Sequence, residues 1–282
     1  MTLSGRRSAA GAAASEVWRV ASEPRGAIDF NCDMGESFGT YKLGLDEEVV
    51  KHVSSVNIAA GFHAGDPDWM ARTVRLAEEQ GAGIGAHPSY PDLAGFGRRD
   101  MSLTPAEVRN VVTYQIGALA GFVRGHRLQH VKPHGAMYNK AVRDPAEATA
   151  IVEAVKAYDP SLILVVLAGS QWETIARRAG LKVAREAYAD RAITPQGTLV
   201  PRSQPGAVIH DEEAVVRRTL KLACEGRVVT IEGKEIDFIA DTICLHGDTP
   251  GAVRLAAEVR RELGKAGVEV RPMASIMGAR AS

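Results

Sequence analysis

The sequence is poor in cysteine and carries no excess of charge of either sign. Its three cysteines, Cys32, Cys224 and Cys244, are too few and too widely spaced for a disulfide framework or a cysteine-based zinc knuckle. Lysine and arginine together number 34 and equal the 34 aspartates and glutamates, so no broad positive field is available for nucleic acid or an anionic membrane. We therefore expect a reducing compartment and a small-molecule substrate.

Long apolar runs and nucleotide-binding motifs are also missing. The longest apolar run, residues 162–168, is far shorter than the roughly 18 to 20 residues that cross a bilayer. The sequence contains no phosphate-binding loop, no dinucleotide fingerprint and no G-x-S-x-G nucleophile elbow. We expect a soluble, cytoplasmic protein with no nucleic-acid or membrane partner. If ATP is involved, its site is of another kind or lies on another chain.

The length of 282 residues and a hydrophobic content of 45% allow one large α/β barrel or two modest domains, of which one barrel is simpler. Residues 1–26 are rich in Ala, Ser, Gly and Arg, and are interpreted as a flexible N-terminal extension, with a cleaved leader as the alternative. Residues 27–282 are then expected to form a single (β/α) barrel domain.

Short apolar runs alternate with amphipathic helical patterns after residue 26. Strands are predicted at residues 27–31, 55–59, 83–86, 128–131, 162–168, 181–185 and 237–245, with a closing strand at 268–271. Helices are predicted at residues 68–80, 105–124, 145–157, 172–179, 211–224 and 250–263. A small hairpin is expected at 227–236, and the irregular stretches 90–103 and 188–206 are typical of binding loops or lids.

Polar clusters follow the predicted strands. They are Asn31-Cys32-Asp33-Met34-Gly35-Glu36, Gly61-Phe62-His63-Ala64-Gly65-Asp66, Ala86-His87-Pro88, Lys132-Pro133-His134-Gly135, Ala189-Asp190-Arg191 and Leu245-His246-Gly247-Asp248. Loops after the strand C-termini of a parallel sheet gather on one face. The clusters are therefore expected to line one pocket, which favours an enzyme over a scaffold.

The residue types in these clusters suit acid–base or metal chemistry. Asp33 can act as a general base, a metal ligand or an orienter of histidine. The histidines that follow different strands can carry protons or bind a metal, and at least two of them should be functional: His63, His87, His134 and His246. Lys132 lies close to His134, and a cation beside a general acid suits a developing oxyanion.

A carboxylate-binding loop is expected at residues 190–204. Asp190, Arg191, Arg202 and Ser203 fall in it, and an arginine there could bind a carboxylate through two parallel hydrogen bonds. Arg202 is preferred because Pro201 and Pro205 bound its segment. The pair Arg98 and Arg99 is a second possibility.

Taken together, these motifs resemble the LamB/YcsF lactam-utilisation family over nearly the whole chain after the extension. The matching segments are long, ordered and numerous: 31–39, 56–66, 85–92, 131–135, 189–191 and 200–204. The resemblance implies a distorted (β/α) barrel of about seven parallel strands, similar to the glycoside hydrolase and deacetylase barrels. It also implies ATP-dependent opening of 5-oxo-L-proline to L-glutamate with two partner subunits, one of them kinase-like, with ATP bound mainly on a partner.

The hypothesis that follows assigns roles to named residues. Asp33 or a histidine would be the base for a water that attacks a partner-activated lactam, and the catalytic set is Asp33, His63, Lys132, His134 and His246. Substrate binding is assigned to Asn31, Glu36, His87, Asp190, Arg191, Arg202 and Ser203. A divalent metal stays open, with Asp33, His63 and His134 as its ligands if it is present. The alternatives are a stand-alone metal-dependent hydrolase or carbohydrate deacetylase, and a non-catalytic subunit that only binds a small acid.

Overall fold

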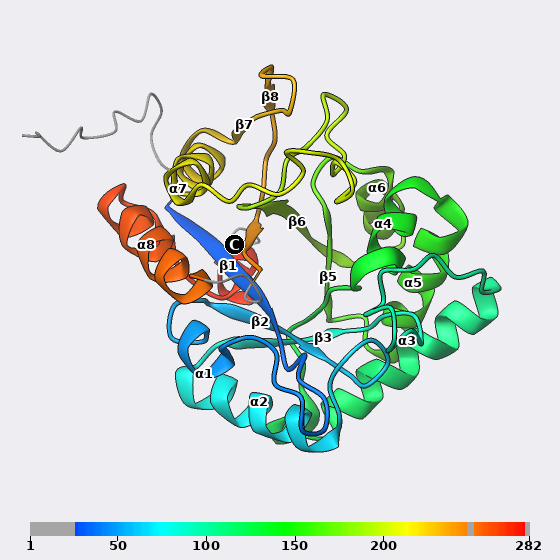
Figure 1. Ribbon diagram of the computed structural model, residues 1–282. Helices are drawn as coiled ribbons and strands as arrows, with labels where there is room; N and C mark the ends of the chain where they lie inside the picture. The colour runs from blue at the N-terminus through cyan, green and yellow to red at the C-terminus, as the bar shows by residue number, and fades with distance from the viewer. Residues whose placement is uncertain (1–25, 247–250, 280–282) are drawn as a thin grey trace, which may run out of the picture.

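The computed structural model describes residues 26–246 and 251–279, and Figure 1 shows its strands at the centre with the helices around them. The central strands are β1 (Ala27–Met34), β2 (Ser55–Ala59), β3 (Gly83–His87), β4 (His130–Val131), β5 (Ile163–Leu167), β6 (Lys182–Tyr188) and β9 (Thr242–Cys244). They run parallel in the order β1-β2-β3-β4-β5-β6-β9, and β9 also pairs with β1. This last pairing closes the sheet, so the predicted barrel of about seven parallel strands is confirmed.

The interior of the barrel is polar as well as apolar. Alternate side chains of a strand face the same side of a sheet, and on β1 the inward set is Asp29, Asn31 and Asp33. Asn57 of β2 donates hydrogen bonds to both Asn31 Oδ1 at 2.7 Å and Asp33 Oδ1 at 2.8 Å. Gly85 of β3 is required here, because a Cβ at this position would lie 2.1 Å from the His130 ring. The strands thus carry a hydrogen-bonded polar core toward their C-terminal ends.

Helices cover the outside of the barrel. They are α1 (Asp46–Val49), α2 (Pro67–Gln80), α3 (Pro105–Ala120), α4 (Gly135–Arg143), α5 (Pro145–Tyr158), α6 (Gln171–Arg178), α7 (Glu212–Leu220), α8 (Ala252–Lys265) and α9 (Met273–Ala279), with short helical turns η1 (Arg124–His126) and η2 (Lys221–Glu225). The start of α3 is fixed by a capping box between Thr104 and Glu107. Within the described ranges, no helix combines the length and the apolar character that a membrane span requires.

Two differences from the predicted elements have local causes. The strand predicted at 237–245 is wrong at its start, because Asp237 ends β8 (Glu235–Asp237), which pairs with β7 (Arg227–Val229) in the predicted hairpin. Phe238 N still donates to Gly226 O of this hairpin, and β9 begins only at Thr242. Helix α4 was not predicted, because its first residue is Gly135 with φ +57° and no side chain caps it.

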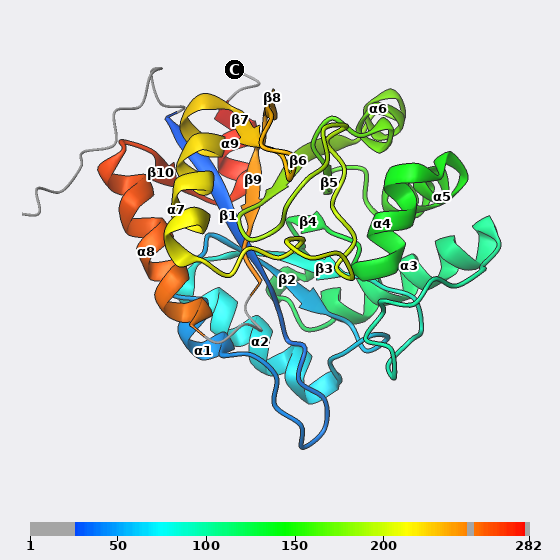
Figure 2. The same ribbon diagram turned by 45° about the horizontal axis from the view of Figure 1, so that its top comes forward.

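The C-terminal segment completes the barrel at its N-terminal end. β10 (Glu269–Val270), the expected closing strand, pairs with the first two residues of β1 and lies outside the barrel circuit. Helix α9 follows, and Met273 packs with Ile163, Val165 and Ala184 of β5 and β6. Figure 2 shows α9 beside β10 and β1. The N-terminal end is therefore covered, while the start predicted for α8 at 250 and the extension predicted at 1–26 lie outside the described residues, Gly26 excepted.

Candidate active site

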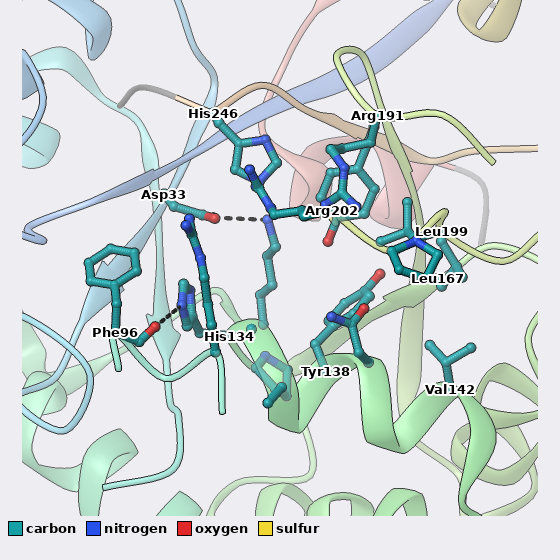
Figure 3. Close-up of a pocket in the computed structure, with 18 of the residues that line it drawn as sticks. Asp33, Phe96, His134, Tyr138, Val142, Leu167, Arg191, Leu199, Arg202 and His246 are labelled. Atoms are coloured by element: carbon teal, nitrogen blue, oxygen red, sulfur yellow. Dashed lines mark hydrogen bonds and ion pairs between the residues drawn. The ribbon is translucent and has the colours of Figure 1, made fainter. Parts of the chain in front are cut away.

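A cavity of about 580 Å³ opens at the C-terminal ends of the barrel strands (Figure 3). Several of the residues that sequence reasoning singled out line it: Asp33, Glu36, His87, Lys132, His134, Arg191, Arg202 and His246. They come from β1, β3, the loop after β4, the N-terminus of α4 and the loops after β6 and β9. Residues from both ends of the barrel sequence thus meet around one cavity.

Lys132 lies at the floor of this cavity and is 1% exposed. Its ammonium is 2.9 Å from Asp33 Oδ1, 2.9 Å from Glu186 Oε1 and 3.0 Å from Cys244 Sγ. Burial by itself would lower the pKa of Lys132, but the charges of Asp33 and the other two neighbours raise it well above its usual range. The three protons of the ammonium are all used, so Lys132 is a fixed positive charge beneath the cavity.

Asp33 is the ionised partner of this lysine. Its Oδ1 accepts hydrogen bonds from Lys132 and Asn57, and its Oδ2 lies 3.3 Å from His87 Nε2. Burial would raise the pKa of the Asp33 carboxyl, but His87 and Lys132 outweigh burial and hold this pKa well below its usual range. A carboxylate of this kind orients its neighbours well and is a weak proton acceptor.

Three histidines and Glu36 form a cluster beside Asp33. His87 Nε2 lies 3.0 Å from His134 Nδ1, and the rings of His63 and His134 stack with centroids 3.9 Å apart. Glu36 Oε1 is 3.3 Å from His63 Nε2 and 3.7 Å from His134 Nδ1. Burial lowers the pKa of both His63 and His134 well below the usual range, so these two rings are neutral at pH 7.

The loop predicted at 90–103 builds one wall of this cluster. Phe96 adopts φ +53°, a left-handed conformation that is rare for an aromatic residue, and its carbonyl accepts a hydrogen bond from His134 Nε2 at 2.9 Å (Figure 3). The next residue is Gly97, where a Cβ would lie 2.8 Å from His63 Cβ and 2.9 Å from His134 Cδ2. The loop therefore presses directly on two of the histidines.

His246 lies on the opposite wall of the cavity. Arg202 donates to His246 Nε2 at 3.1 Å, and Asp190 Oδ2 lies 2.8 Å from His246 Nδ1. Since an arginine can only donate, Nε2 is the acceptor and Nδ1–H is the donor to Asp190. Burial would raise the pKa of Asp190, but His246 lowers it, so Asp190 is an anion that orients a neutral imidazole.

Other expected substrate-binding residues lie elsewhere or serve the framework. Asn31 is fully buried below the cavity, and its amide donates to Thr242 Oγ1 at 2.6 Å. Arg191 donates to the backbone carbonyls of Val200 and Ala207, so it holds the loop that carries Arg202. Ser203 is exposed and is not among the described residues that line the cavity.

Two residues of the site were missed by sequence reasoning. Glu186 lies in the middle of β6 with no exposed surface, and Cys244 ends β9; both contact the Lys132 ammonium. A charged residue inside an otherwise apolar strand is the only sequence signal for Glu186. Cys244 gave none, because a buried cysteine is ordinary core composition.

Comparisons with known proteins agree with this architecture. The LamB/YcsF family model matches residues 28–278. The chain belongs to the LamB/YcsF family. Its similarity to other LamB/YcsF proteins extends over nearly their full length: it is 55% identical over 248 residues to a 5-oxoprolinase subunit of Thermococcus onnurineus, covering 87% of this chain and 97% of the relative.

Two further LamB/YcsF relatives give the same picture. The corresponding 5-oxoprolinase subunit of Syntrophobacter fumaroxidans is 56% identical over 247 residues, covering 87% of this chain and 98% of that protein. A crystal structure of a lactam utilization protein from Thermus thermophilus superposes with a TM-score of 0.83 at 50% identity, covering 87% of this chain and 99% of that one. The LamB/YcsF assignment therefore holds in both sequence and fold.

Proposed function

We propose that this chain is the subunit of an ATP-dependent 5-oxoprolinase that directs water onto the activated lactam, giving L-glutamate. The observation that carries the proposal is one cavity with Asp33 and Lys132 at its floor and an Asp190-oriented His246 beside Arg202 on its wall. The names of relatives more than 50% identical over most of the chain support the substrate, and their naming as one subunit of 5-oxoprolinase supports a complex.

The need for ATP follows from the chemistry of a five-membered lactam. Its amine and carboxyl groups are held at high effective concentration, so the ring re-forms readily and hydrolysis needs coupling to phosphate cleavage. The sequence has no phosphate-binding loop. ATP is therefore assigned mainly to a kinase-like partner, one of two further subunits, which would phosphorylate the lactam oxygen.

His246 suits the role of proton acceptor. Its Nε2 lone pair faces Arg202, and Asp190 holds Nδ1–H, which is the arrangement of an imidazole oriented by a carboxylate. When Arg202 turns to the substrate carboxylate, Nε2 becomes free to take a proton from water as the water adds to the activated carbon. The ring C–N bond then breaks, and the nitrogen takes the proton back from His246.

Lys132 and Asp33 would stabilise the charge that develops on the carbonyl oxygen. Of the acceptors around the Lys132 ammonium, the Cys244 sulfur is the weakest. An oxyanion entering from the cavity could replace it while Asp33 and Glu186 keep the ammonium in place.

The decisive experiment combines this chain with its candidate partner subunits and measures 5-oxoproline-dependent ATP hydrolysis and glutamate release. Asp33→Asn should lower turnover at least about 100-fold, on the scale of removing one electrostatic contact in a transition state. Asp237→Asn, at the exposed end of β8, is the matched control and should leave turnover unchanged. Glutamate release without ATP or partners would instead support a stand-alone hydrolase.

Asp190→Asn tests the proton acceptor separately. An asparagine can present its amide N–H to His246 and favour the wrong tautomer, so kcat should fall by about 10² to 10⁴. A rise in KM with unchanged kcat would favour the non-catalytic alternative, in which the chain only binds a small acid.

A further inference from the structure

We propose that Glu36, His63, His87 and His134 form a binding site for one divalent transition-metal ion of the zinc type. One ligand atom from each of the four residues lies within 4.8 Å of all the others. The contacts His87 Nε2–His134 Nδ1, His63 Nε2–Glu36 Oε1 and His134 Nδ1–Glu36 Oε1 measure 3.0, 3.3 and 3.7 Å. Two ligands about 2.1 Å from a shared ion are roughly 3.0 to 3.4 Å apart at angles between 90° and tetrahedral.

Hydrogen bonds on the outer nitrogens orient two of the rings. His87 Nδ1 lies 2.6 Å from the Lys132 carbonyl, and His134 Nε2 lies 2.9 Å from the Phe96 carbonyl. A carbonyl can only accept, so both outer nitrogens carry the protons, and in neutral rings both inner nitrogens present lone pairs to each other at 3.0 Å. Such a contact needs a cation between the rings, and backbone carbonyls behind the rings are the usual outer support of metal-binding histidines.

His63 has the freedom to complete the set. It has no exposed surface, and its Nδ1 finds no hydrogen-bond partner among the described residues. Its ring is parallel to that of His134, so Nε2 must turn out of the stack to point at the shared ion. Turning about the Cβ–Cγ bond breaks no hydrogen bond at Nδ1, which makes this adjustment inexpensive.

The donor set selects the class of ion. Three imidazole nitrogens and one carboxylate oxygen suit Zn²⁺, Co²⁺ or Ni²⁺, whereas Mg²⁺ and Ca²⁺ prefer oxygen ligands throughout. Glu36, His87 and His134 line the cavity, so an ion here could act on a water or an oxygen in it. The second group of close ligand atoms, Asp33, Cys244 and His246, is unsuitable because the Lys132 ammonium already contacts the first two.

Metal binding by this chain alone tests the site without ATP, lactam or partners, so its failure would leave the proposed function untouched. The full chain is stripped with a chelator, and Zn²⁺ is titrated in competition with a chromophoric chelator. We expect one Zn²⁺ per chain and, with Co²⁺, the visible absorption of a four-coordinate site. Glu36→Gln and His87→Gln should each weaken binding by more than about 100-fold, since outer-shell changes already cost 10- to 100-fold.

His210→Gln is the control, because this histidine is exposed and should not alter the affinity. Zn²⁺ should also raise the Tm of the wild type but not of Glu36→Gln, a readout that does not require the His87 variant to fold. The proposal is overturned if the wild type binds no stoichiometric ion, which would leave a shared proton between His87 and His134, or if both ligand variants bind like the control.

Discussion

Replacing Lys132 with methionine should cost a large part of the folding free energy. The ammonium lies 2.9 Å from both Asp33 and Glu186, and the two carboxylates are almost completely buried. Removing one partner of a buried ion pair costs about 3 to 5 kcal/mol, because the remaining charge is left without a counter-ion. Methionine has nearly the same length and volume, so the packing contribution should stay below about 1.5 kcal/mol.

Urea unfolding of the wild type, Lys132→Met and a surface control measures this cost. Lys51 pairs with Glu48 at 2.8 Å, but both side chains are about half exposed, so Lys51→Met should cost no more than about 0.5 kcal/mol. Because the pKa of Asp33 is lowered in the folded protein, its ionisation stabilises the fold above about pH 4 and this stability is lost on acidification. The gap between wild type and Lys132→Met should therefore narrow at low pH. A cost similar to that of the control at pH 7 would refute the reasoning.

Two further predictions concern single side chains. Burial raises the pKa of Asp29 from 3.8 to about 6, so the unfolded chain releases this proton first and the fold loses about 3 kcal/mol as the pH rises from below 4 to above 6; Asp29→Asn should remove this loss, and a pH-independent difference in urea unfolding would contradict it. If Arg202 binds the substrate carboxylate, Arg202→Met should raise the KM for 5-oxoproline about 10- to 100-fold with little change in unfolding free energy, and an unchanged KM would exclude that role.

Elements with their own local signals were predicted from the sequence. Helix α3 begins at Pro105 as expected, because Thr104 and Glu107 form a capping box, and the hairpin turns at Gly233 with φ +78°. Helix α4 has no such signal, since it begins at a positive-φ glycine whose Cβ would collide with Gly97 O. Contacts from the preceding loop at Gly97, distant in sequence, fix its start, and these cannot be read from local pattern.

The polar site was partly foreseeable for the same reason. Asp33, His87, His134 and His246 follow strand ends, and parallel topology alone brings such positions to one face. The division of labour was not foreseeable. Which histidine contacts Asp190 and which contacts Glu36 depends on strand register and on the Phe96 backbone, both of which are properties of the assembled barrel.

The pairing of β1 with β9 and β10 has a consequence for synthesis on the ribosome. The first strand to emerge needs partners from residues 242–244 and 269–270, which are made last. Until then, one flank of β1 stays open, and Asp33 has neither its full sheet nor the neighbouring Cys244. Growth of the nascent chain can therefore form helices and β1–β6 early, but the active centre matures only in a final post-synthetic step, during which the open flank is exposed to chaperones and to other chains.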